Sequence, residues 1–474
     1  MGGSGQTEET AGRAIAEDEL TAFHRTLSKL RALDADDPTR LHAEQVAFSF
    51  ARDGRLRRRR ARQQRLTQAD ATVTAATATG ATTRREDAPL HAGGTAGVYA
   101  RARHCYVCKR RYQQADAFYH LLCPTCAADN SARRALRTDL RGRRVLLTGG
   151  RVKIGFQLAL MMLRDGAEVL VTSRFPRDTL RRFSAAAGSA QWFDRLTVVA
   201  IDLRDPRQVL GLCEQLRDEG EPLDILVNNA AQTVRRPPES FARLAAGEAA
   251  PADAGAVLPG AVRSAPGFRP LPVALTDGGT RPREADGALS LVLTAAGTAA
   301  GTDVDEAGLL PDPAPGNSWS ARLGEVDPVE LLETQLVNAL APALLCDRLL
   351  PLLLASPHPR RYVVNVTAVE GRFAVRNKTA GHPHTNMAKA ALNMLTRTSG
   401  PELMKQGVHM CSVDTGWITD ENPVPKKTRL ADRGFRTPLD VIDGAARVYD
   451  PIVRGEAGSP VSGVFLKDYQ EAAW

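Results

Sequence analysis

The sequence predicts an α/β fold, in which a doubly wound parallel sheet of about seven strands follows a small four-cysteine knuckle module and a basic helical extension. Three observations lead to this fold class. Short apolar runs alternate with helical patterns between residues 144 and 466, a glycine-rich turn joins the first run to a helix, and two Cys-x-x-Cys pairs precede that turn. Strands that alternate with helices pair in parallel and carry helices on both faces, which is the arrangement of a Rossmann-type sheet.

The expected strands are short apolar runs that turn residues separate from the helical patterns between them. They span residues 144–148, 168–173, 196–201, 223–227, 361–366, 408–413 and 461–466. A doubly wound sheet binds its ligands beyond the carboxyl ends of the strands, where the strand order reverses. The residues that follow each run are therefore the first candidates for a binding site.

A glycine-rich turn follows the first of these runs. The sequence from Val145 to Gly155 reads Val-Leu-Leu-Thr-Gly-Gly-Arg-Val-Lys-Ile-Gly, and an amphipathic helical pattern continues to Leu163. A strand, a tight turn and a helix N-terminus in this order hold a pyrophosphate, because backbone N–H groups point at the anion. The turn alone is a weak signal, so its meaning depends on the residues at the other strand ends.

The chain divides into three segments by composition. We expect a helical, basic and partly disordered extension over residues 1–100, a cysteine module over 101–138 and the sheet domain over 139–474. Within the extension, apolar spacing predicts helices at 17–33 and 41–50, and the Ala/Thr/Gly-rich stretch 71–94 is typical of a linker. An Ala/Gly/Pro-rich insertion at 237–323 has too few apolar side chains for a core and is expected to be disordered.

The basic charge lies in the first 150 residues, which hold 26 Lys and Arg against 16 Asp and Glu, while the whole chain has a formal net charge of +8. Its densest part is residues 55–65, with seven arginines. Such a run can bind the phosphates of a nucleic acid or another polyanion, and it can also contact a protein partner. A solvated helix face or a disordered arm is the alternative interpretation.

Neither a membrane-spanning segment nor a leader is expected from the sequence. A membrane helix needs roughly 18 or more apolar residues in succession, and the stretch 340–354 is interrupted by Asp347 and Arg348. The first residues lack the charged and then apolar pattern of a signal peptide. We therefore expect a cytoplasmic protein without a membrane partner.

Four cysteines form two Cys-x-x-Cys pairs, Cys105 with Cys108 and Cys123 with Cys126, separated by 14 residues. Two pairs at this separation bring four thiolates to one tetrahedral ion, so the sequence predicts a closed, structural zinc site. Disulfides are the alternative, and a cytoplasmic setting disfavours them. The module could equally present a surface to a partner, a choice that the sequence leaves open.

The strand ends resemble, in order, the motifs of the classical short-chain dehydrogenase/reductase superfamily, over residues 139–474 without the insertion. Thr148-Gly-Gly-Arg-Val-Lys-Ile-Gly155 resembles the superfamily's Thr-Gly-x-x-x-Gly-x-Gly turn, with Lys153 in place of the middle glycine. The other matching positions are Asp202 and Leu203 at the adenine, Asn229 and Ala230 after the fourth strand, and Gly416, Trp417 and Thr419 in the loop over the nicotinamide. The resemblance implies a dinucleotide bound by these residues together with Gly149 and Ile154.

The end of the second strand decides between the two nicotinamide cofactors. An acidic residue there binds the adenosine ribose hydroxyls and repels a 2′-phosphate, whereas this chain has Ser173 followed by Arg174. A guanidinium can pair with a phosphate through two hydrogen bonds, and Arg151 in the glycine turn adds a second positive charge. The sequence therefore predicts NADP(H) rather than NAD(H), unless Arg174 is an ordinary surface residue.

The catalytic positions are only partly kept. The resemblance implies that Lys389 is the superfamily's lysine and that Asn338 holds its water relay, but Thr385 replaces the tyrosine four residues before the lysine. The serine position falls at Ala368, and the neighbouring Thr367 is a candidate substitute for its hydroxyl. Reduction of a carbonyl needs an acid for the developing alkoxide, and an aliphatic hydroxyl is too weak an acid to replace a phenol.

Two functions of different classes follow. In the first, the chain is an NADP(H)-dependent oxidoreductase that acts on a carbonyl or double-bond substrate, with His384 as proton donor and Thr385 as a substrate ligand, because histidine titrates near neutrality. In the second, it is a catalytically inactive NADP(H)-binding regulator or scaffold, whose zinc module and basic arm bind a protein or nucleic-acid partner. The stretch at 424–435, with the basic run Lys426-Lys427-Thr-Arg429, favours an acidic substrate. The resemblance implies a homo-oligomer.

Overall fold

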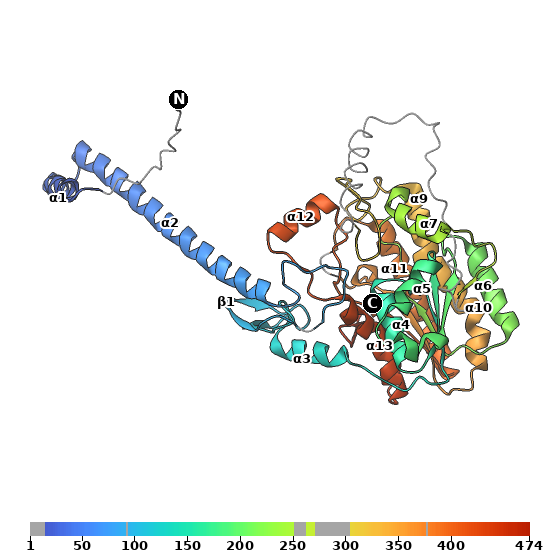
Figure 1. Ribbon diagram of the computed structural model, residues 1–474. Coiled ribbons are helices and arrows are strands. Elements are labelled where there is room, and N and C mark those ends of the chain that lie inside the picture. Colours follow the sequence, from blue (N-terminus) through green and yellow to red (C-terminus); the bar gives the residue numbers. More distant parts are fainter. Residues whose placement is uncertain (1–14, 92, 251–261, 271–303, 376–377) are drawn as a thin grey trace, which may run out of the picture. The chain divides into compact units, whose positions relative to one another are not determined.

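The computed structural model describes residues 15–91, 93–250, 262–270, 304–375 and 378–474. The chain forms two compact units, Met1–Asp70 and Ala71–Trp474. In the first unit, α1 (Glu17–Arg31) begins with three acidic residues and ends with two basic ones, as the helix dipole favours. The long helix in Figure 1 is α2 (Pro38–Ala76), which extends the helix predicted at 41–50 in both directions.

The second unit is built around one sheet, in which the described residues place nine strands in the order β11-β10-β9-β8-β6-β3-β4-β5-β7. The strands are β3 (Arg144–Leu147), β4 (Glu168–Ser173), β5 (Leu196–Ala200), β6 (Ile225–Asn228), β7 (Val262–Ser264), β8 (Arg361–Thr367), β9 (Val408–Asp414), β10 (Val464–Lys467) and β11 (Gln470–Ala472). Neighbours run parallel except β11, which pairs antiparallel with β10. The seven predicted strands are confirmed, and the strand order reverses between β3 and β6.

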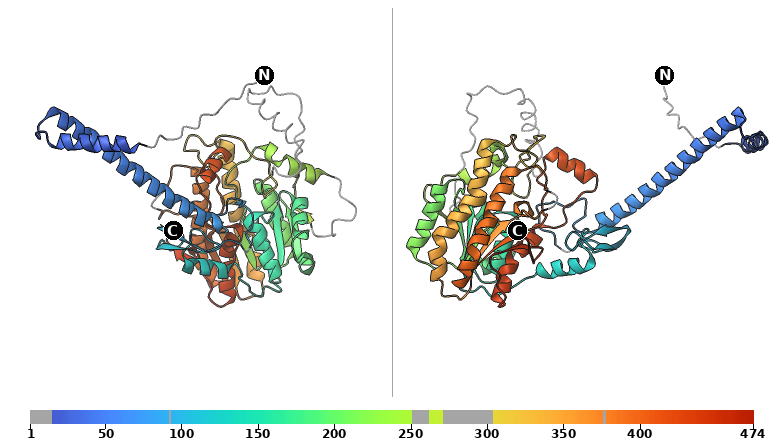
Figure 2. Two further views of the ribbon diagram at one scale, coloured as in Figure 1. Left: turned by 60° about the vertical axis from the view of Figure 1, so that its left-hand side comes forward. Right: turned by 180° about the vertical axis from the view of Figure 1, so that it is seen from behind.

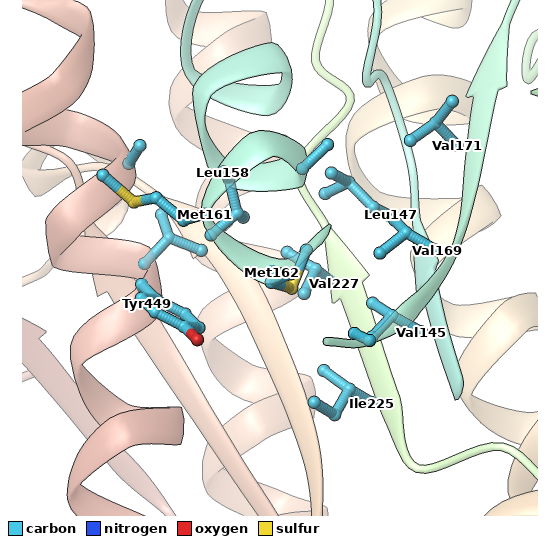
Figure 3. Close-up of a cluster of buried hydrophobic side chains, with 14 of the residues drawn as sticks. Val145, Leu147, Leu158, Met161, Met162, Val169, Val171, Ile225, Val227 and Tyr449 are labelled. Atoms are coloured by element: carbon cyan, nitrogen blue, oxygen red, sulfur yellow. The ribbon is translucent and has the colours of Figure 1, made fainter. Parts of the chain in front are cut away.

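Helices cover both faces of the sheet, which confirms the doubly wound arrangement (Figure 2). On one face lie α4 (Lys153–Arg164), α5 (Pro176–Ser184) and α13 (Val441–Glu456), and on the other lie α6 (Pro206–Glu219), α10 (Ala341–Ala355) and α11 (Pro383–Lys405). The first face packs a core that includes Leu147, Leu158, Met162 and Tyr449 (Figure 3). Because both faces are covered, the strands are apolar along their length instead of alternating.

A long apolar helical segment, Pro328–Ala355, combines α9 (Pro328–Gln335), the π-turn η4 (Leu336–Leu340) and α10. Among the described residues it is the one helix that is long and apolar enough to cross a membrane by length and composition, and half of its most apolar window is buried. Leu345, Leu349 and Leu353 pack into the core that α10 shares with α6. Packing inside the protein therefore accounts for its apolar character.

The cysteine module consists of a hairpin and a helix. In the hairpin β1 (Gly97–His104) pairs antiparallel with β2 (Arg111–Ala115), and the helix is α3 (Pro124–Arg133). Its buried core combines Tyr99, Tyr119 and Leu122 with Leu439 and Val441 of the sheet domain. The module is therefore packed on the sheet domain through a shared apolar core.

The stretch before the module differs from the expected linker. Helix α2 continues to Ala76, and the hydroxyl of the buried Thr79 lies 2.8 Å from His120 Nδ1. The Arg84 guanidinium donates to the carbonyl oxygen of Thr437 at 2.6 Å. Small and polar side chains can fix a chain through hydrogen bonds without contributing to an apolar core, which is why composition alone did not reveal these contacts.

The described parts of the insertion lie against the sheet. They form η3 (Pro238–Phe241), α7 (Ala242–Ala249) and β7, which pairs with β5. The backbone N–H of Leu310 donates to the Ser240 carbonyl at 2.9 Å. The expectation of disorder is wrong for these parts, because main-chain hydrogen bonds to an edge strand need no apolar side chains. Residues 251–261 and 271–303, on which the rest of that expectation falls, lie outside the described residues.

Candidate functional site

Hydrogen bonds join two strand ends at the point where the strand order reverses. The hydroxyl of Thr148, after β3, accepts from the backbone N–H groups of Asn229 and Ala230, each at 3.0 Å, after β6. The Asn229 amide donates in turn to the carbonyl oxygens of Thr148 and Gly149 at 3.1 Å. The structure thus brings these four predicted residues together and fixes the glycine turn beside the neighbouring strand.

The glycine turn requires its two outer glycines. Gly149 has a φ of +71°, and a Cβ atom there would lie 2.9 Å from Ala230 Cα. A Cβ atom on Gly155 would lie 2.1 Å from the Gly149 carbonyl oxygen. Both positions therefore exclude a side chain, and the turn can present the N-terminus of α4 to an anion.

Lys153, at the middle glycine position, has a backbone conformation that favours glycine. Its φ is +54°, in the left-handed region that glycine adopts most readily, and α4 begins at this residue. The nearby Glu421 faces this lysine: burial raises the pKa of Glu421, but Lys153 and Lys427 hold it below its ordinary value. The next residue, Ile154, packs against the core of the cysteine module. A strained backbone position therefore keeps a cation beside the turn.

Arg174 stands after β4 as an unpaired cation. Within the part of the chain that the structure describes, its guanidinium makes no hydrogen bond or ion pair, and its Cζ atom lies 5.7 Å and 5.1 Å from the ring centres of Phe175 and Phe241. Burial lowers the pKa of Arg174, yet an arginine keeps its charge at neutral pH. This arrangement fits the phosphate contact predicted for Arg174.

Two other residues predicted at this end of the site are occupied by protein contacts. Arg151 forms an ion pair with Asp178 at 2.8 Å and donates to the Ala307 carbonyl at 2.7 Å. The Ser173 hydroxyl accepts from the backbone N–H of Phe175 at 3.0 Å. The free second cation expected from Arg151 is therefore not found, because its guanidinium is bonded to Asp178 and to a backbone carbonyl.

Asp202 and Leu203 follow β5, as the predicted strand end requires. The Asp202 carboxylate pairs with Arg204 at 2.6 Å, and Arg204 also reaches Glu333 at 3.2 Å. Burial raises the pKa of Asp202, but the hydrogen bonds from Arg204 hold it below its ordinary value. Leu203 is buried in the sheet core. Asp202 is thus an oriented carboxylate, and Arg204, which sequence reasoning missed, is the residue that orients it.

The ammonium group of Lys389 is buried at the carboxyl edge of the sheet. Its Nζ atom donates to the carbonyl oxygen of Val366 near the end of β8, at 2.9 Å. Burial lowers the pKa of Lys389 to about 8, and the carboxylate of Glu370 opposes that shift. The hydroxyl of Thr367 donates to the Lys389 carbonyl at 3.4 Å. Lys389 can therefore exchange a proton near neutral pH, while Thr367 contacts the helix that carries it.

Asn338 lies in the π-turn η4, between α9 and α10. Its amide oxygen accepts from the backbone N–H of Gln232 at 2.7 Å, and its amide N–H donates to the Gln232 carbonyl at 2.9 Å. A π-turn inserts an extra residue into a helix and is common at functional sites. The side chain ties this helix to the loop after β6, while the water relay implied by the resemblance stays a prediction.

Thr385 and His384 occupy different sides of α11. Thr385 lies one helical turn before Lys389 on the same side, and its buried hydroxyl has no hydrogen-bond partner among the described residues. His384 lies about 140° around the helix from Lys389, and its fully buried ring makes no hydrogen bond there either. Burial lowers the pKa of His384. His384 therefore lies on a different side of α11 from Lys389 and Thr385, and its role as proton donor stays a prediction.

A cavity of about 490 Å³ opens beside this part of α11. Its lining includes Glu370 and Asn386, which are close in sequence to the catalytic positions, together with Arg322, Lys378 and Lys426. The Lys378 ammonium also donates to the backbone carbonyl of Glu370. Cations therefore outnumber carboxylates on the walls of this cavity.

The loop over the predicted nicotinamide position follows β9. Gly416 has a φ of +81°, and the Thr419 hydroxyl donates to the Glu421 carboxylate at 2.8 Å. The backbone N–H of Trp417 donates to the hydroxyl of Tyr106 at 2.9 Å. Tyr106 belongs to the cysteine module, and sequence reasoning missed it because no local pattern signals a contact between residues so far apart in the chain.

The four predicted metal ligands converge. The sulfur atoms of Cys105, Cys108, Cys123 and Cys126 lie within 4.8 Å of one another. Those of Cys108 and Cys123 are 3.7 Å apart, close to the edge of about 3.8 Å in a tetrahedron with Zn–S bonds of about 2.3 Å. The arrangement is compatible with one zinc ion in a closed coordination sphere.

We expect the purified protein to carry one zinc ion per chain. Replacing Cys105 and Cys126 together by serine should abolish metal binding, because two of the four ligands are removed. Native mass spectrometry measures the stoichiometry, and Cys213→Ala, which removes a buried thiol on α6, is the matched control. Retention of the metal by the double variant would contradict the four-cysteine centre.

The arginine run 55–65 lies on α2, within the first unit. Its seven arginines are exposed and form no ion pair among the described residues. The run is therefore helical, and the alternative of a disordered arm is wrong for these residues. Binding of a polyanion or a protein partner by this run stays a prediction.

Comparisons with known proteins bear on the sheet domain. The family model described as short chain dehydrogenase matches residues 143–248. An uncharacterized protein of Acanthamoeba polyphaga mimivirus is 30% identical over 369 residues, which cover 74% of this chain and 71% of that protein. C-signal of Myxococcus xanthus is 34% identical over 126 residues, 27% of this chain and 74% of that protein. A solved short chain dehydrogenase from Burkholderia cenocepacia, in complex with NADP, is similar with a TM-score of 0.44 and 19% identity, over 69% of this chain and 97% of that one.

The matched family segment includes the glycine turn and the strands from β3 to β6. The sheet order and the residues at the strand ends give the same assignment, an NAD(P)-binding fold of oxidoreductase type. The chain therefore belongs to the short-chain dehydrogenase/reductase superfamily.

Proposed function

We propose that the protein is an NADP(H)-dependent oxidoreductase that acts on a carbonyl or a double bond. The observation that carries the proposal is the buried ammonium of Lys389 at the carboxyl edge of the sheet. It lies one helical turn after the Thr385 hydroxyl, which has no hydrogen-bond partner within the described part of the chain. A buried cation and an unpaired buried hydroxyl each cost free energy in the folded chain. Buried polar groups of this kind are common at functional sites, where a bound ligand supplies the interactions that they lack.

NADP(H) fits the carboxyl edge of the sheet. Gly149 and Gly155 carry no side chains, so a pyrophosphate can approach the backbone of the turn closely. Arg174, which forms no ion pair within the described residues, offers a cation for a 2′-phosphate. Asp202, held by Arg204, lies where the adenosine part would bind. When bound, NADPH supplies a hydride to an electrophilic carbon of the substrate.

The chain's own residues would supply orientation and a proton. In this proposal the Thr385 hydroxyl donates a hydrogen bond to the substrate oxygen, and the Lys389 ammonium gives its proton to the alkoxide as it forms. Because the pKa of Lys389 is about 8, its protonated form prevails at neutral pH. Lys389 thereby takes the role that sequence reasoning gave to His384.

We further propose that the substrate carries an acidic group. Arg322, Lys378 and Lys426 line the cavity beside α11, and Glu370 is the carboxylate among its lining residues. A cavity with an excess of cations attracts anions and raises their local concentration. Lys426 belongs to the basic stretch at 424–435, from which an acidic substrate was predicted and whose helical part is α12 (Val424–Asp432).

A second candidate is a protein that binds NADP(H) without turnover and passes the bound state to a partner. The observation in its favour is the loss of one hydroxyl and of the acidic phenol, since Ala368 stands at the serine position and Thr385 at the tyrosine position. Mixing the protein with NADPH and a panel of aldehydes, ketones and enones separates the two functions. Oxidation of NADPH by any member supports the enzyme, and binding without oxidation across the panel supports the second candidate.

Replacing Arg174 by alanine should weaken NADPH binding about 10- to 100-fold and leave NADH binding within about twofold, because a charged hydrogen bond contributes roughly 1.5–3 kcal/mol. Fluorescence titration with each nucleotide measures both dissociation constants. Arg177→Ala, at an exposed arginine three residues further on, is the control and should change neither. Equal effects on both nucleotides would contradict the 2′-phosphate contact, and no binding of either would contradict the cofactor.

A further inference from the structure

A side-chain hydrogen bond connects the cysteine module to the loop after β9, which contains Gly416, Trp417 and Thr419 and is called the cofactor loop below. Tyr106 lies between Cys105 and Cys108, and its hydroxyl accepts a hydrogen bond from the backbone N–H of Trp417 at 2.9 Å. Its own backbone N–H donates to the Leu121 carbonyl at 2.8 Å. Two metal ligands and one main-chain hydrogen bond therefore fix the position from which Tyr106 reaches the loop.

An apolar core joins the same two parts. Ile418, two residues after Gly416 in the cofactor loop, is buried in the core of the module, and Ile154 of the glycine turn packs against that core. Both isoleucine side chains contact Gly444 of α13. A Cβ atom on Gly444 would lie 2.3 Å from the Ile418 side chain and 2.9 Å from the Ile154 side chain. The two loops that would hold the ends of a dinucleotide therefore rest on one surface of the module.

A buried polar network forms the third connection. Lys467 bonds to Asp414 at 3.2 Å, and its ammonium lies 5.5 Å from the centre of the Tyr106 ring. The Asp414 carboxylate accepts from the backbone N–H of Gly416 at 3.2 Å. Arg447 of α13 donates to Asn130 of the module at 2.9 Å. Movement of the cysteine module would thus disturb the contacts that Tyr106 and Asp414 make with the loop at Gly416 and Trp417.

We propose that the cysteine module is part of the dinucleotide site, with Tyr106 as a positioning residue, so that zinc in the module and dinucleotide in the site bind with positive coupling. Zinc binding orders small cysteine modules, because much of the binding free energy is folding free energy. Loss of the metal would release Tyr106 and the loop at Trp417. Coupling between two ligands is reciprocal, so dinucleotide must retain zinc by the same factor by which zinc improves dinucleotide binding.

The inference rests on the proposed cofactor, and the experiment separates the two. NADPH is titrated into the zinc-loaded full-length protein, into Tyr106→Phe and into Tyr112→Phe. The control residue Tyr112 is a tyrosine of the same module, whose hydroxyl donates to the His120 carbonyl at 2.9 Å. We expect Tyr106→Phe to keep its zinc and to bind NADPH about 2- to 10-fold more weakly, as loss of one hydrogen bond implies, while Tyr112→Phe binds like the wild type.

The second measurement is the rate at which a colorimetric chelator removes zinc, with and without saturating NADPH. We expect NADPH to slow zinc loss from the wild type and to slow it less in Tyr106→Phe. Binding of NADPH that neither Tyr106→Phe nor zinc removal alters, together with unchanged zinc loss, overturns the coupling alone. Failure of the zinc-loaded wild type to bind NADPH at all overturns the proposed cofactor and the coupling with it.

Discussion

Lys389→Met should lower the turnover of a carbonyl substrate about 10²- to 10⁴-fold, because it removes the proposed proton donor while keeping most of the side-chain volume. The rate of NADPH oxidation with the most reactive member of a carbonyl panel measures this effect. Lys405→Met is the matched control, since Lys405 lies at the far end of α11, exposed and paired with Glu402. Its turnover should equal that of the wild type.

The pH profile and the arginine variant distinguish a proton donor from a simple positive charge. Burial lowers the pKa of Lys389 to about 8, so the ammonium form needed for reduction is lost as the pH rises through that value. The rate should be level below about pH 8 and fall above it. Lys389→Arg keeps the charge but cannot donate a proton, and should be nearly as slow as Lys389→Met. A rate that rises with pH, or an active arginine variant, would contradict the assignment.

Arg134→Met should lower the free energy of unfolding by about 3–5 kcal/mol, because it leaves two buried carboxylates without their cation. Arg134 follows α3 and pairs with Asp440 at 2.5 Å and with Asp443 at 3.0 Å, at the start of α13. Both carboxylates are fully buried, and the Tyr119 hydroxyl donates to Asp443 at 2.6 Å. Urea denaturation followed by tryptophan fluorescence measures the difference.

The loss of unfolding free energy in Arg134→Met should depend on pH. Burial raises the pKa of Asp440, but Arg134 holds it below its ordinary value, so this group stabilises the fold at neutral pH and ceases to do so in acid. Without Arg134 burial prevails and protonation relieves the buried charge. The loss should therefore be smaller at about pH 5 than at about pH 7.5.

An exposed arginine nearby provides the control for this stability experiment. Arg137 is 65% exposed and lies 3.9 Å from Asp165. Its replacement by methionine should change the free energy of unfolding by less than about 0.5 kcal/mol, because water screens an exposed ion pair. If Arg134→Met lowers the free energy of unfolding no more than Arg137→Met does, the buried ion pairs of Arg134 do not hold the cysteine module on the sheet domain.

The sheet could be predicted because its information is local. Each buried parallel strand is an apolar run bounded by turn residues, and the runs at 168–173 and 408–413 match β4 and β9 within one residue. β7 could not be predicted in this way. Its three residues contribute main-chain hydrogen bonds to β5, which leave no apolar signature in the sequence.

The candidate site was predictable where a motif fixes both residue type and position. Gly149 follows β3, Gly155 lies in the first turn of α4 and Lys389 lies on α11, as expected, because each belongs to a sequence pattern tied to one element. His384 lies on a different side of α11 from Thr385, because a difference of one residue on a helix turns the side chain by about 100°. Tyr106 could not be predicted from the sequence, because its contact with Trp417 joins residues that lie far apart in the chain.

Both edges of the sheet end in strands of three residues, β7 beside β5 and β11 beside β10. A long edge strand exposes a row of unpaired N–H and C=O groups, onto which a second chain can add and start aggregation. Short terminal strands shield the longer strands behind them and leave little backbone for such addition. Among the described residues, the insertion and the C-terminal segment thus end the sheet in short strands that offer little backbone for edge-to-edge addition.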